Sequence, residues 1–421
     1  MKKKHRHPVL PGWALGLLGI LPAAAAFWFL ALPGACPSDG TSSVIQSAGS
    51  AAEELLFGIL PFPAEPEPPA PDLAEAQPPK EAPVPESTLR ARALLEEMSP
   101  EDKVGQMFIA RYPAENAAGK ASTYRLGGYI LFARDFENRS PKQAAAQIQA
   151  CQDAAGIPML IAVDEEGGKV NRVSRYPAFR QAPFPSSQVL YENGGFDAVR
   201  LDTLEKSRLL KSLGINVNFA PVCDISQDPA DFIYDRSFGK DASLTSAYVE
   251  TAVQAMKEEQ MGCVLKHFPG YGNNADTHTG ISYDRRPYET FTSSDFLPFQ
   301  AGIESGADMV LVSHNIVDCM DAQFPASLSP EVHRILREEL GFSGVIVTDD
   351  LAMDGIRTFT GDTQAAVQAV LAGNDLLCCT DFETQIPAVL QAVETGEISM
   401  EQIDASVLRI LELKISLGIL F

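Results

Sequence analysis

The sequence predicts an α/β protein whose main domain is a (β/α)8 barrel. From residue 87 onward, eight short apolar runs rich in β-branched residues alternate with stretches of helical character. Continuous apolar strands that alternate with helices are typical of a parallel sheet covered on its faces. Eight such units in about 330 residues favour a closed barrel over an open sheet. A dinucleotide-binding open sheet would also require a G-x-G-x-x-G sequence after a strand, and the sequence has none there.

The predicted elements follow one another with little spacing. The strands cover residues 106–110, 128–132, 159–163, 216–222, 263–267, 309–312, 345–348 and 375–378. The clearest helices cover residues 141–155, 197–213, 244–260, 330–340 and 363–372. Several of these helices begin at Ser, Asp or Thr, and four end at a glycine, namely Gly214, Gly262, Gly341 and Gly373. These are the residues that usually begin and end helices.

A charged or imidazole residue follows nearly every predicted strand. These residues are Arg111, Arg134, Asp164, Asp224, Lys266 with His267, His314, Asp349 and Asp381. The carboxyl ends of barrel strands meet on one face, where the active sites of such barrels lie. We therefore expect a polar pocket on that face.

Three segments contain most of the polar residues that we expect in this pocket. They read VDEEGGKVNR (163–172), KHFPGYGNNADTH (266–278) and VTDDLAM (347–353). In the first segment, the two glycines allow the backbone to approach a ligand closely. Asp164 and Arg172 on either side of them can form hydrogen bonds with the hydroxyl groups of a ligand.

These segments, together with NFAPVCD (218–224) and DRSFG (235–239), resemble in the same order glycoside hydrolase family 3. The resemblance covers residues 87–421 and is to the β-N-acetylglucosaminidase (β-N-acetylhexosaminidase) branch of that family. It implies a retaining hydrolase that removes terminal β-linked N-acetylglucosamine. Asp349 would be the nucleophile that forms a covalent glycosyl-enzyme. The alternative role of helix cap suits Asp350 better, before a helix expected near Leu351.

The resemblance assigns the acid/base to Asp276 and His278. Most retaining glycosidases use a second carboxylate for this step. Imidazole titrates near neutrality, so His278 can protonate the leaving oxygen and later activate water. Asp276 can hold the ring as a triad carboxylate does, although a surface histidine is the alternative interpretation. His314 is a candidate neighbour of the leaving group.

The resemblance also implies a sugar-binding set, which comprises Asp164, Arg172, Arg236, Lys266 and His267. Arg236 has the alternative of pairing with Asp224 or Asp235. We expect Glu165 and Glu166 to stabilise the double-glycine turn or to face solvent.

The chain departs from the family pattern in two places and ends early. Tyr271 stands where the family often has histidine, and Thr277 where serine is frequent; neither removes the Asp276–His278 pair. The chain stops at Phe421 without the second domain that many members carry, so we expect a site complete within the barrel. We expect no metal or organic cofactor, because the sequence shows neither a ligand cluster nor a phosphate-binding loop. A β-glucosidase, a phosphorylase of the same family and a non-catalytic cell-wall glycan-binding protein remain alternatives.

The N-terminal region predicts export. Lys2, Lys3, Lys4 and Arg6 precede an uncharged stretch whose apolar part, residues 13–32, has the ~20 residues needed to span a bilayer. Residues 61–86 contain ten prolines and six acidic residues, which cannot form a core. We predict a signal or membrane-anchor segment over 1–36, a disordered linker over 37–86 and the barrel over 87–421. The enzyme would lie outside the cytoplasmic membrane, tethered to it, or secreted if the anchor is cleaved.

Composition limits the remaining partners. The net charge of −22 argues against nucleic acid, whose binding depends on Lys and Arg. Seven cysteines without a C-x-x-C spacing disfavour zinc. The apolar surroundings of Cys223, Cys263 and Cys378 favour buried thiols over disulfides. We expect a monomer whose partners are a glycan substrate and, through the N-terminal segment, the membrane.

Overall fold

The structure is a computed structural model that describes residues 84–274, 280, 282–361 and 363–421. The predicted anchor segment and nearly all of the predicted linker lie outside these residues. Within the described part, no helix is both long and apolar enough to cross a membrane.

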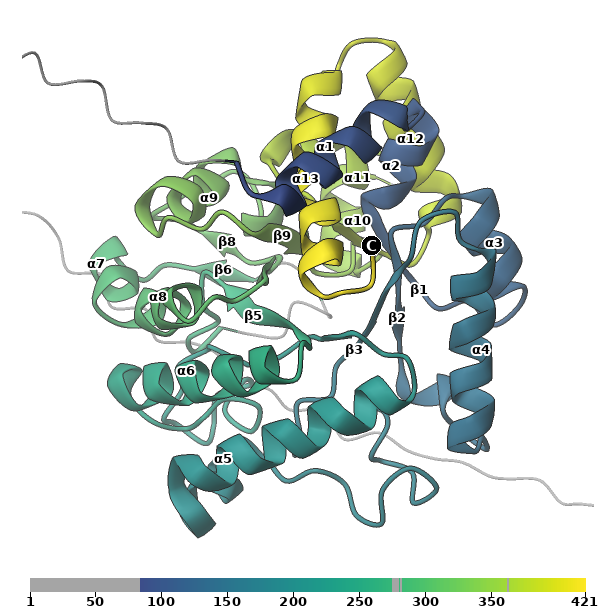
Figure 1. Ribbon diagram of the computed structural model, residues 1–421. Coiled ribbons are helices and arrows are strands. Elements are labelled where there is room, and N and C mark those ends of the chain that lie inside the picture. The colour runs from purple at the N-terminus through teal and green to yellow at the C-terminus, as the bar shows by residue number, and fades with distance from the viewer. Residues whose placement is uncertain (1–83, 275–279, 281, 362) are drawn as a thin grey trace, which may run out of the picture. The chain divides into compact units, whose positions relative to one another are not determined.

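A ring of parallel strands forms the centre of the fold (Figure 1). In the described part of the chain these eight strands are β1 (Phe108–Arg111), β2 (Gly128–Leu131), β3 (Leu160–Val163), β4 (Val217–Asn218), β5 (Gly262–Phe268), β7 (Met309–Val312), β9 (Val345–Thr348) and β10 (Leu377–Cys379). Their order is β10-β1-β2-β3-β4-β5-β7-β9. A parallel bridge between Val347 and Leu376 closes the ring. The prediction of a (β/α)8 barrel is confirmed.

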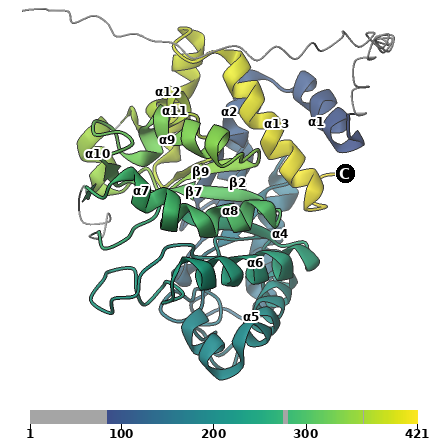
Figure 2. The same cartoon turned by 90° about the vertical axis from the view of Figure 1, so that its left-hand side faces the viewer.

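Helices surround the ring of strands, as the two views show (Figures 1 and 2). They are α1 (Glu86–Glu97), α2 (Pro100–Gln106), α3 (Ala117–Thr123), α4 (Pro141–Ala154), α5 (Ser187–Ser212), α6 (Ala242–Glu258), α7 (Tyr288–Thr290), α8 (Phe296–Glu304), α9 (Pro330–Arg334), α10 (Asp354–Thr360), α11 (Ala365–Ala372), α12 (Phe382–Glu394) and α13 (Met400–Ser416). Two short strands outside the ring, β6 (Tyr283–Asp284) and β8 (Ile316–Val317), pair with each other.

Side-chain caps begin several of these helices. In α4, the Ser140 hydroxyl accepts from the amide of Gln143, and Pro141 occupies the first turn, where no amide donor is required. The helix predicted over 197–213 is the second part of α5, which begins ten residues earlier because a kink at Gly194 and Gly195 joins two helical parts.

Three of the four predicted glycine ends are confirmed. Gly214, Gly341 and Gly373 have φ angles of 85°, 69° and 110°, a region that favours glycine. The prediction for Gly262 is wrong, because Gln260 takes the left-handed conformation (φ 50°) after α6. Gly262 instead begins β5, where a Cβ atom would lie 3.0 Å from Val217 Cγ2.

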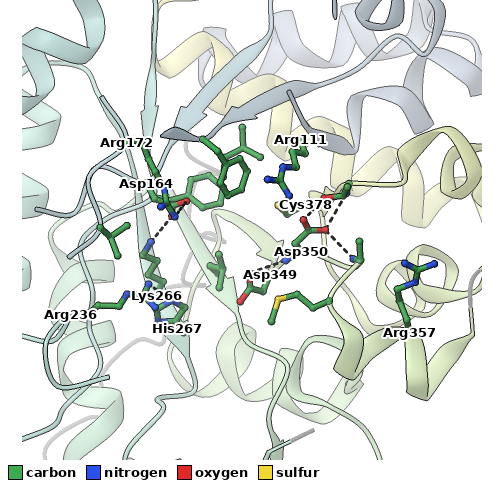
Figure 3. A pocket seen from close by; sticks show the side chains of 18 residues that line it. Arg111, Asp164, Arg172, Arg236, Lys266, His267, Asp349, Asp350, Arg357 and Cys378 are labelled. Atoms are coloured by element: carbon green, nitrogen blue, oxygen red, sulfur yellow. Dashed lines mark hydrogen bonds and ion pairs between the residues drawn. The ribbon is translucent and has the colours of Figure 1, made fainter. Parts of the chain in front are cut away.

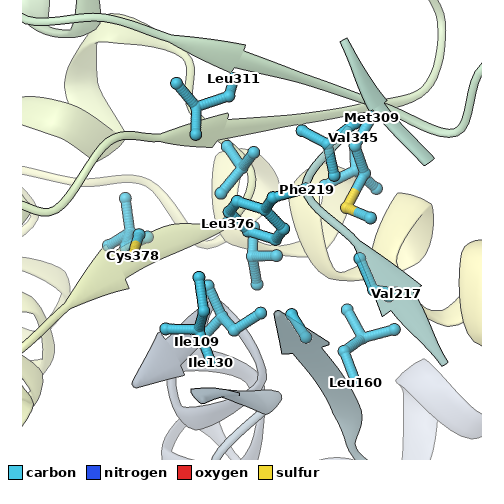
Figure 4. Close-up of a cluster of buried hydrophobic side chains, with 14 of the residues drawn as sticks. Ile109, Ile130, Leu160, Val217, Phe219, Met309, Leu311, Val345, Leu376 and Cys378 are labelled. Carbon is cyan, nitrogen blue, oxygen red and sulfur yellow. The ribbon is translucent and has the colours of Figure 1, made fainter. Parts of the chain in front are cut away.

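Apolar side chains fill the barrel interior beneath the strand ends (Figure 4). The buried residues drawn there include Ile109, Ile130, Leu160, Val217, Phe219, Met309, Leu311, Val345 and Leu376. Such layers make the interior a packed core and leave the strand ends to form the site. The cysteine prediction is also confirmed: among the described cysteines none forms a disulfide, and only Cys319 is exposed.

Candidate active site

A cavity of about 560 Å³ lies at the carboxyl ends of the barrel strands (Figure 3). Six of the predicted site residues line it, namely Asp164, Arg172, Arg236, Lys266, His267 and Asp349. Lys266 and His267 lie near the end of β5 and the others follow β3, β4 or β9, while Arg111 and Thr380 extend the lining to β1 and β10. Residues far apart in the sequence thus meet in one pocket.

Some of the strand-end residues do not line this cavity. Arg134 donates to the carbonyl of Tyr112 (3.1 Å), and Asp381 accepts from Gln385 in α12 (3.1 Å). Asp224 and His314 are buried behind the cavity wall. The expected polar pocket is therefore present, but these four strand-end residues are not part of its lining.

Lys266 organises the polar side of the cavity. Its Nζ lies 2.7 Å from Asp164 Oδ1 and 2.6 Å from Glu166 Oε1. Arg172 lies on the other oxygen of Asp164, at 3.7 Å. The lysine side chain is 2% exposed, so these contacts compensate a cation that is almost removed from water.

The expectation that Glu166 stabilises the double-glycine turn or faces solvent is wrong, because its side chain is buried between two cations. It forms a two-point ion pair with Arg236, with Nε–Oε2 and Nη2–Oε1 distances of 3.1 and 2.7 Å. Burial alone would raise the pKa of Glu166, but the charges of Arg236 and Lys266 outweigh it and hold the pKa well below its usual range. The alternation of Asp164 and Glu166 along an extended run was the available signal, since residues two apart share a face.

Glu165 does what was expected of it. Its Oε2 accepts from the amides of Arg172 and Val173, both at 2.7 Å, and the residue is completely buried. The carboxylate therefore closes the double-glycine turn and orients the chain that carries Arg172.

His267 lies in the cavity wall between Arg236 and Asp224. Its Nδ1 is 2.7 Å from Asp224 Oδ2, and its Nε2 is 3.1 Å from Arg236 Nη2. The ring of Tyr271 packs against the imidazole edge to face at 5.2 Å. Arg236 pairs with neither Asp224 nor Asp235, which were the alternatives; the partner of Asp235 is Lys169.

The turn after β9 presents Asp349 to the cavity. The amide of Asp350 donates to Asp349 Oδ1 (2.8 Å). Asp350 Oδ1 accepts from the amides of Ala352 (3.0 Å) and Thr380 (3.1 Å), and the Thr380 hydroxyl donates to the other oxygen. The expected helix start near Leu351 is wrong, because α10 begins at Asp354. Asp350 instead ties the turn to the end of β10.

His314 supports the same turn from behind. Its Nε2 lies 3.1 Å from the carbonyl oxygen of Asp350, and its Nδ1 lies 2.7 Å from Ser327 Oγ. The side chain is buried and is not part of the cavity lining. The expected place of His314 beside the leaving group stays a prediction, because the predicted acid/base residues lie outside the described part of the chain.

An aromatic wall with two cations completes the pocket. The guanidinium carbons of Arg111 and Arg172 lie 4.3 and 5.4 Å from the ring centre of Phe132. Both distances are within the range of a cation–π contact. The lining also contains Arg357, and most of the remainder is apolar, with Ile130, Val170, Phe219, Leu311 and Met353.

The predicted acid/base residues, Asp276 and His278, lie outside the described residues. The chain before them is fixed at Gly270, whose carbonyl accepts from Arg286 (3.2 Å), and at Asn274, which donates to Asp284 (2.6 Å). Arg286 also pairs with Asp295 at 2.9 Å. Burial raises the pKa of Asp295 to about 6, although Arg286 opposes the rise.

The described residues contain no group of three or more His, Cys, Asp or Glu side chains that could hold a metal ion. The side chains gathered in the cavity are carboxylates, cations and an imidazole beside apolar groups. Carboxylates and guanidinium groups suit a ligand rich in hydroxyls, and an aspartate can act as a nucleophile toward a glycoside. The barrel and the pocket therefore define a glycosidase-type site.

Comparison with known proteins gives the family. The profile of the glycosyl hydrolase family 3 N-terminal domain matches residues 99–413. The β-hexosaminidase LpqI of Mycobacterium tuberculosis is 32% identical over 349 residues, which cover 80% of this chain and 88% of that one. The solved β-N-acetylglucosaminidase of Paenibacillus sp., also of family 3, has a TM-score of 0.71 at 33% identity, covering 76% of this chain and 63% of that one. Solved LpqI has a TM-score of 0.69 at 29% identity, covering 76% and 95%. The chain belongs to glycoside hydrolase family 3, in its β-N-acetylhexosaminidase branch.

Proposed function

We propose that the enzyme hydrolyses terminal β-linked N-acetylglucosamine from peptidoglycan fragments or chitooligosaccharides, with retention of configuration. The observation that carries this proposal is that Asp349 lines the same cavity as the complete sugar-binding set. The relatives support it by name: one is a β-hexosaminidase and another a β-N-acetylglucosaminidase.

The distribution of roles among the carboxylates supports Asp349 as the nucleophile. The described lining of the cavity contains three acidic residues, Asp164, Asp349 and Asp350. Asp164 is paired with Lys266 and Arg172, as a group that orients a sugar and its neighbouring cations would be. Asp350 accepts from two backbone amides and thereby shapes the turn. The contacts of Asp164 suit a binding role and those of Asp350 suit a structural role. Among the three acidic residues of the lining, this favours Asp349 as the nucleophile.

In the proposed reaction Asp349 attacks the anomeric carbon, and the bond to the leaving oxygen breaks. His278 donates a proton to that oxygen while Asp276 stabilises the imidazolium. In the second step His278 takes a proton from water, which attacks the anomeric carbon and releases Asp349. Support for these two residues comes from the family resemblance of the segment that follows His267.

We further propose that the reaction takes place outside the cytoplasmic membrane. The support is the basic N-terminus followed by the apolar residues 13–32 and the proline-rich residues 61–86. Membrane fractionation after expression of the full chain would test the location. Activity confined to the cytosol would contradict it.

The reaction is tested with the 4-nitrophenyl β-glycosides of N-acetylglucosamine and glucose, each with and without inorganic phosphate. We expect hydrolysis of the N-acetyl substrate alone and no stimulation by phosphate. Preference for the glucoside would overturn the proposed sugar specificity, and strong stimulation by phosphate would indicate phosphorolysis. A folded protein that binds N-acetylglucosamine without turnover would indicate a glycan-binding function.

A further inference from the structure

The wall of the cavity contains a continuous chain of hydrogen-bonded groups that begins at Asp224. Asp224 is 1% exposed and contacts Nδ1 of His267 through Oδ2. Nε2 of His267 contacts Arg236, which in turn is paired with Glu166. Arg236 and His267 are labelled side by side in Figure 3, next to Lys266.

The chemistry of arginine decides the direction of these bonds. A guanidinium group carries only donors, so the 3.1 Å contact requires Nε2 of His267 to accept. A neutral imidazole has one donor and one acceptor, so its proton must lie on Nδ1. That proton points at Asp224 Oδ2, 2.7 Å away.

The surroundings of Asp224 agree with this assignment. Its Oδ2 also accepts from the amide of His267 (3.1 Å), and its Oδ1 accepts from the amide of Tyr271 (2.8 Å). With these contacts both oxygens of Asp224 act as acceptors, which leaves Nδ1 of His267 as the donor. Protonation of Nε2 would place a second N–H and a second positive charge against Arg236.

We propose that Asp224 is a positioning residue that holds His267 as a neutral imidazole with its proton on Nδ1, so that Nε2 presents a hydrogen-bond acceptor to the cavity. A hydroxyl of the terminal sugar can then donate to Nε2 and share it with Arg236. His267 in this form serves recognition and is not an acid. The role in sugar binding rests on the proposed function; the tautomer itself does not.

The test combines histidine ¹⁵N spectra of the full chain with steady-state kinetics. In the wild-type protein at pH 7 we expect the ring of His267 to be protonated on Nδ1 only. The signal is identified by its loss in His267→Asn. His333 provides an internal reference, because its Nδ1 lies 2.8 Å from the carbonyl of Ser329 and must donate as well.

The variant Asp224→Asn keeps the shape of the side chain, but its amide can donate to Nδ1. We expect the proton of His267 to move to Nε2 and KM for the N-acetyl substrate to rise on the order of 10-fold, the effect of losing one hydrogen bond between neutral groups. Asp308→Asn is the matched control: Asp308 is a buried carboxylate at the opposite end of the barrel, and it accepts from the amide of Cys263 (3.1 Å). It should leave the His267 spectrum and KM unchanged.

A wild-type ring protonated on Nε2, or on both nitrogens, would overturn the proposal even if Asp224→Asn does not fold. An unchanged tautomer in Asp224→Asn would also overturn it. Absence of wild-type hydrolysis with the expected spectrum would reject the proposed reaction and keep the tautomer assignment.

Discussion

Glu166 Oε1 lies 2.6 Å from Lys266 Nζ, and both side chains are almost completely buried, at 5% and 2% exposure. Neither residue would tolerate this environment alone, because an isolated buried charge is strongly destabilising. Arg236 and Asp164 extend the pair on either side. Two of the cations that line the cavity, Lys266 and Arg236, are therefore held in place by a shared carboxylate.

Replacement of Glu166 by Gln should weaken substrate binding. The shape is kept, but Lys266 and Arg236 lose their shared negative charge, so we expect a rise in KM of about 10-fold or more and a loss of about 3 kcal/mol in the free energy of unfolding. Kinetics and urea unfolding would measure both. Glu258→Gln, which breaks the exposed Arg200–Glu258 pair, is the control and should change stability by less than about 1 kcal/mol. Equal effects of the two variants would contradict this role of Glu166.

Replacement of Asp349 by Asn should abolish turnover. The amide cannot form the glycosyl ester, so we expect kcat to fall by about 10⁴-fold or more while the thermal midpoint stays close to that of the wild type. The rate of 4-nitrophenol release gives kcat. Asp381→Asn removes a strand-end carboxylate that does not line the cavity, and should retain activity. Substantial turnover by Asp349→Asn would assign the nucleophile to another residue.

Replacement of Thr380 by Val should affect the rate more than binding. The hydroxyl that donates to Asp350 is lost at nearly constant volume, so the turn that presents Asp349 is less well held. We expect kcat to fall about 10-fold, the equivalent of roughly 1.4 kcal/mol, with little change in KM. Thr395→Val at the exposed end of α12 is the control. A change confined to KM would argue against this role for Thr380.

Lys414 should make stability depend on pH. The residue is completely buried, and its Nζ contacts Gln106 Oε1 at 2.6 Å. Burial lowers the pKa of Lys414 to about 7, whereas an unfolded lysine has a pKa of ~10.4. Above pH 7 the unfolded chain therefore binds more protons, and stability should rise by up to about 1.4 kcal/mol per pH unit.

The variant Lys414→Met should remove this rise. Urea unfolding of both proteins between pH 7 and 8 would show this as a smaller slope of the unfolding free energy against pH for the variant. This range lies below the pKa of ~8.5 of an ordinary thiol. Lys240→Met at a partly exposed position is the control and should keep the wild-type slope. Parallel profiles for Lys414→Met and the wild type would mean that the buried lysine keeps an ordinary pKa.

The sequence was sufficient for the barrel, because each strand is an apolar run of a few residues and each helix has its own amphipathic pattern. It was also sufficient to place Asp349 and the sugar-binding set in one pocket, since strand ends converge in this fold. It was not sufficient for Glu166, whose contacts join residues 70 and 100 positions away. Composition cannot distinguish such a carboxylate from one in a solvated turn.

Local backbone conformation was the other feature that could not be predicted from the sequence. Gln260 and Gly262 both stand near the end of α6, and propensity alone favours the glycine as the left-handed residue. The structure uses Gln260, because β5 has to begin at Gly262, close to Val217. The start of α10 was misplaced for a similar reason, since Asp350 bonds to Thr380 at the end of the neighbouring strand β10 as well as to Ala352, and the helix begins only at Asp354.

The first and last strands of the barrel, β1 and β10, lie side by side, with Phe108 opposite Leu377. Arg111 and Thr380 at their ends both line the cavity, so the pocket has no complete wall until nearly the whole chain has been synthesised and the ring has closed. We therefore expect a chain truncated before β10 to lack activity even though it contains all the other strands of the barrel.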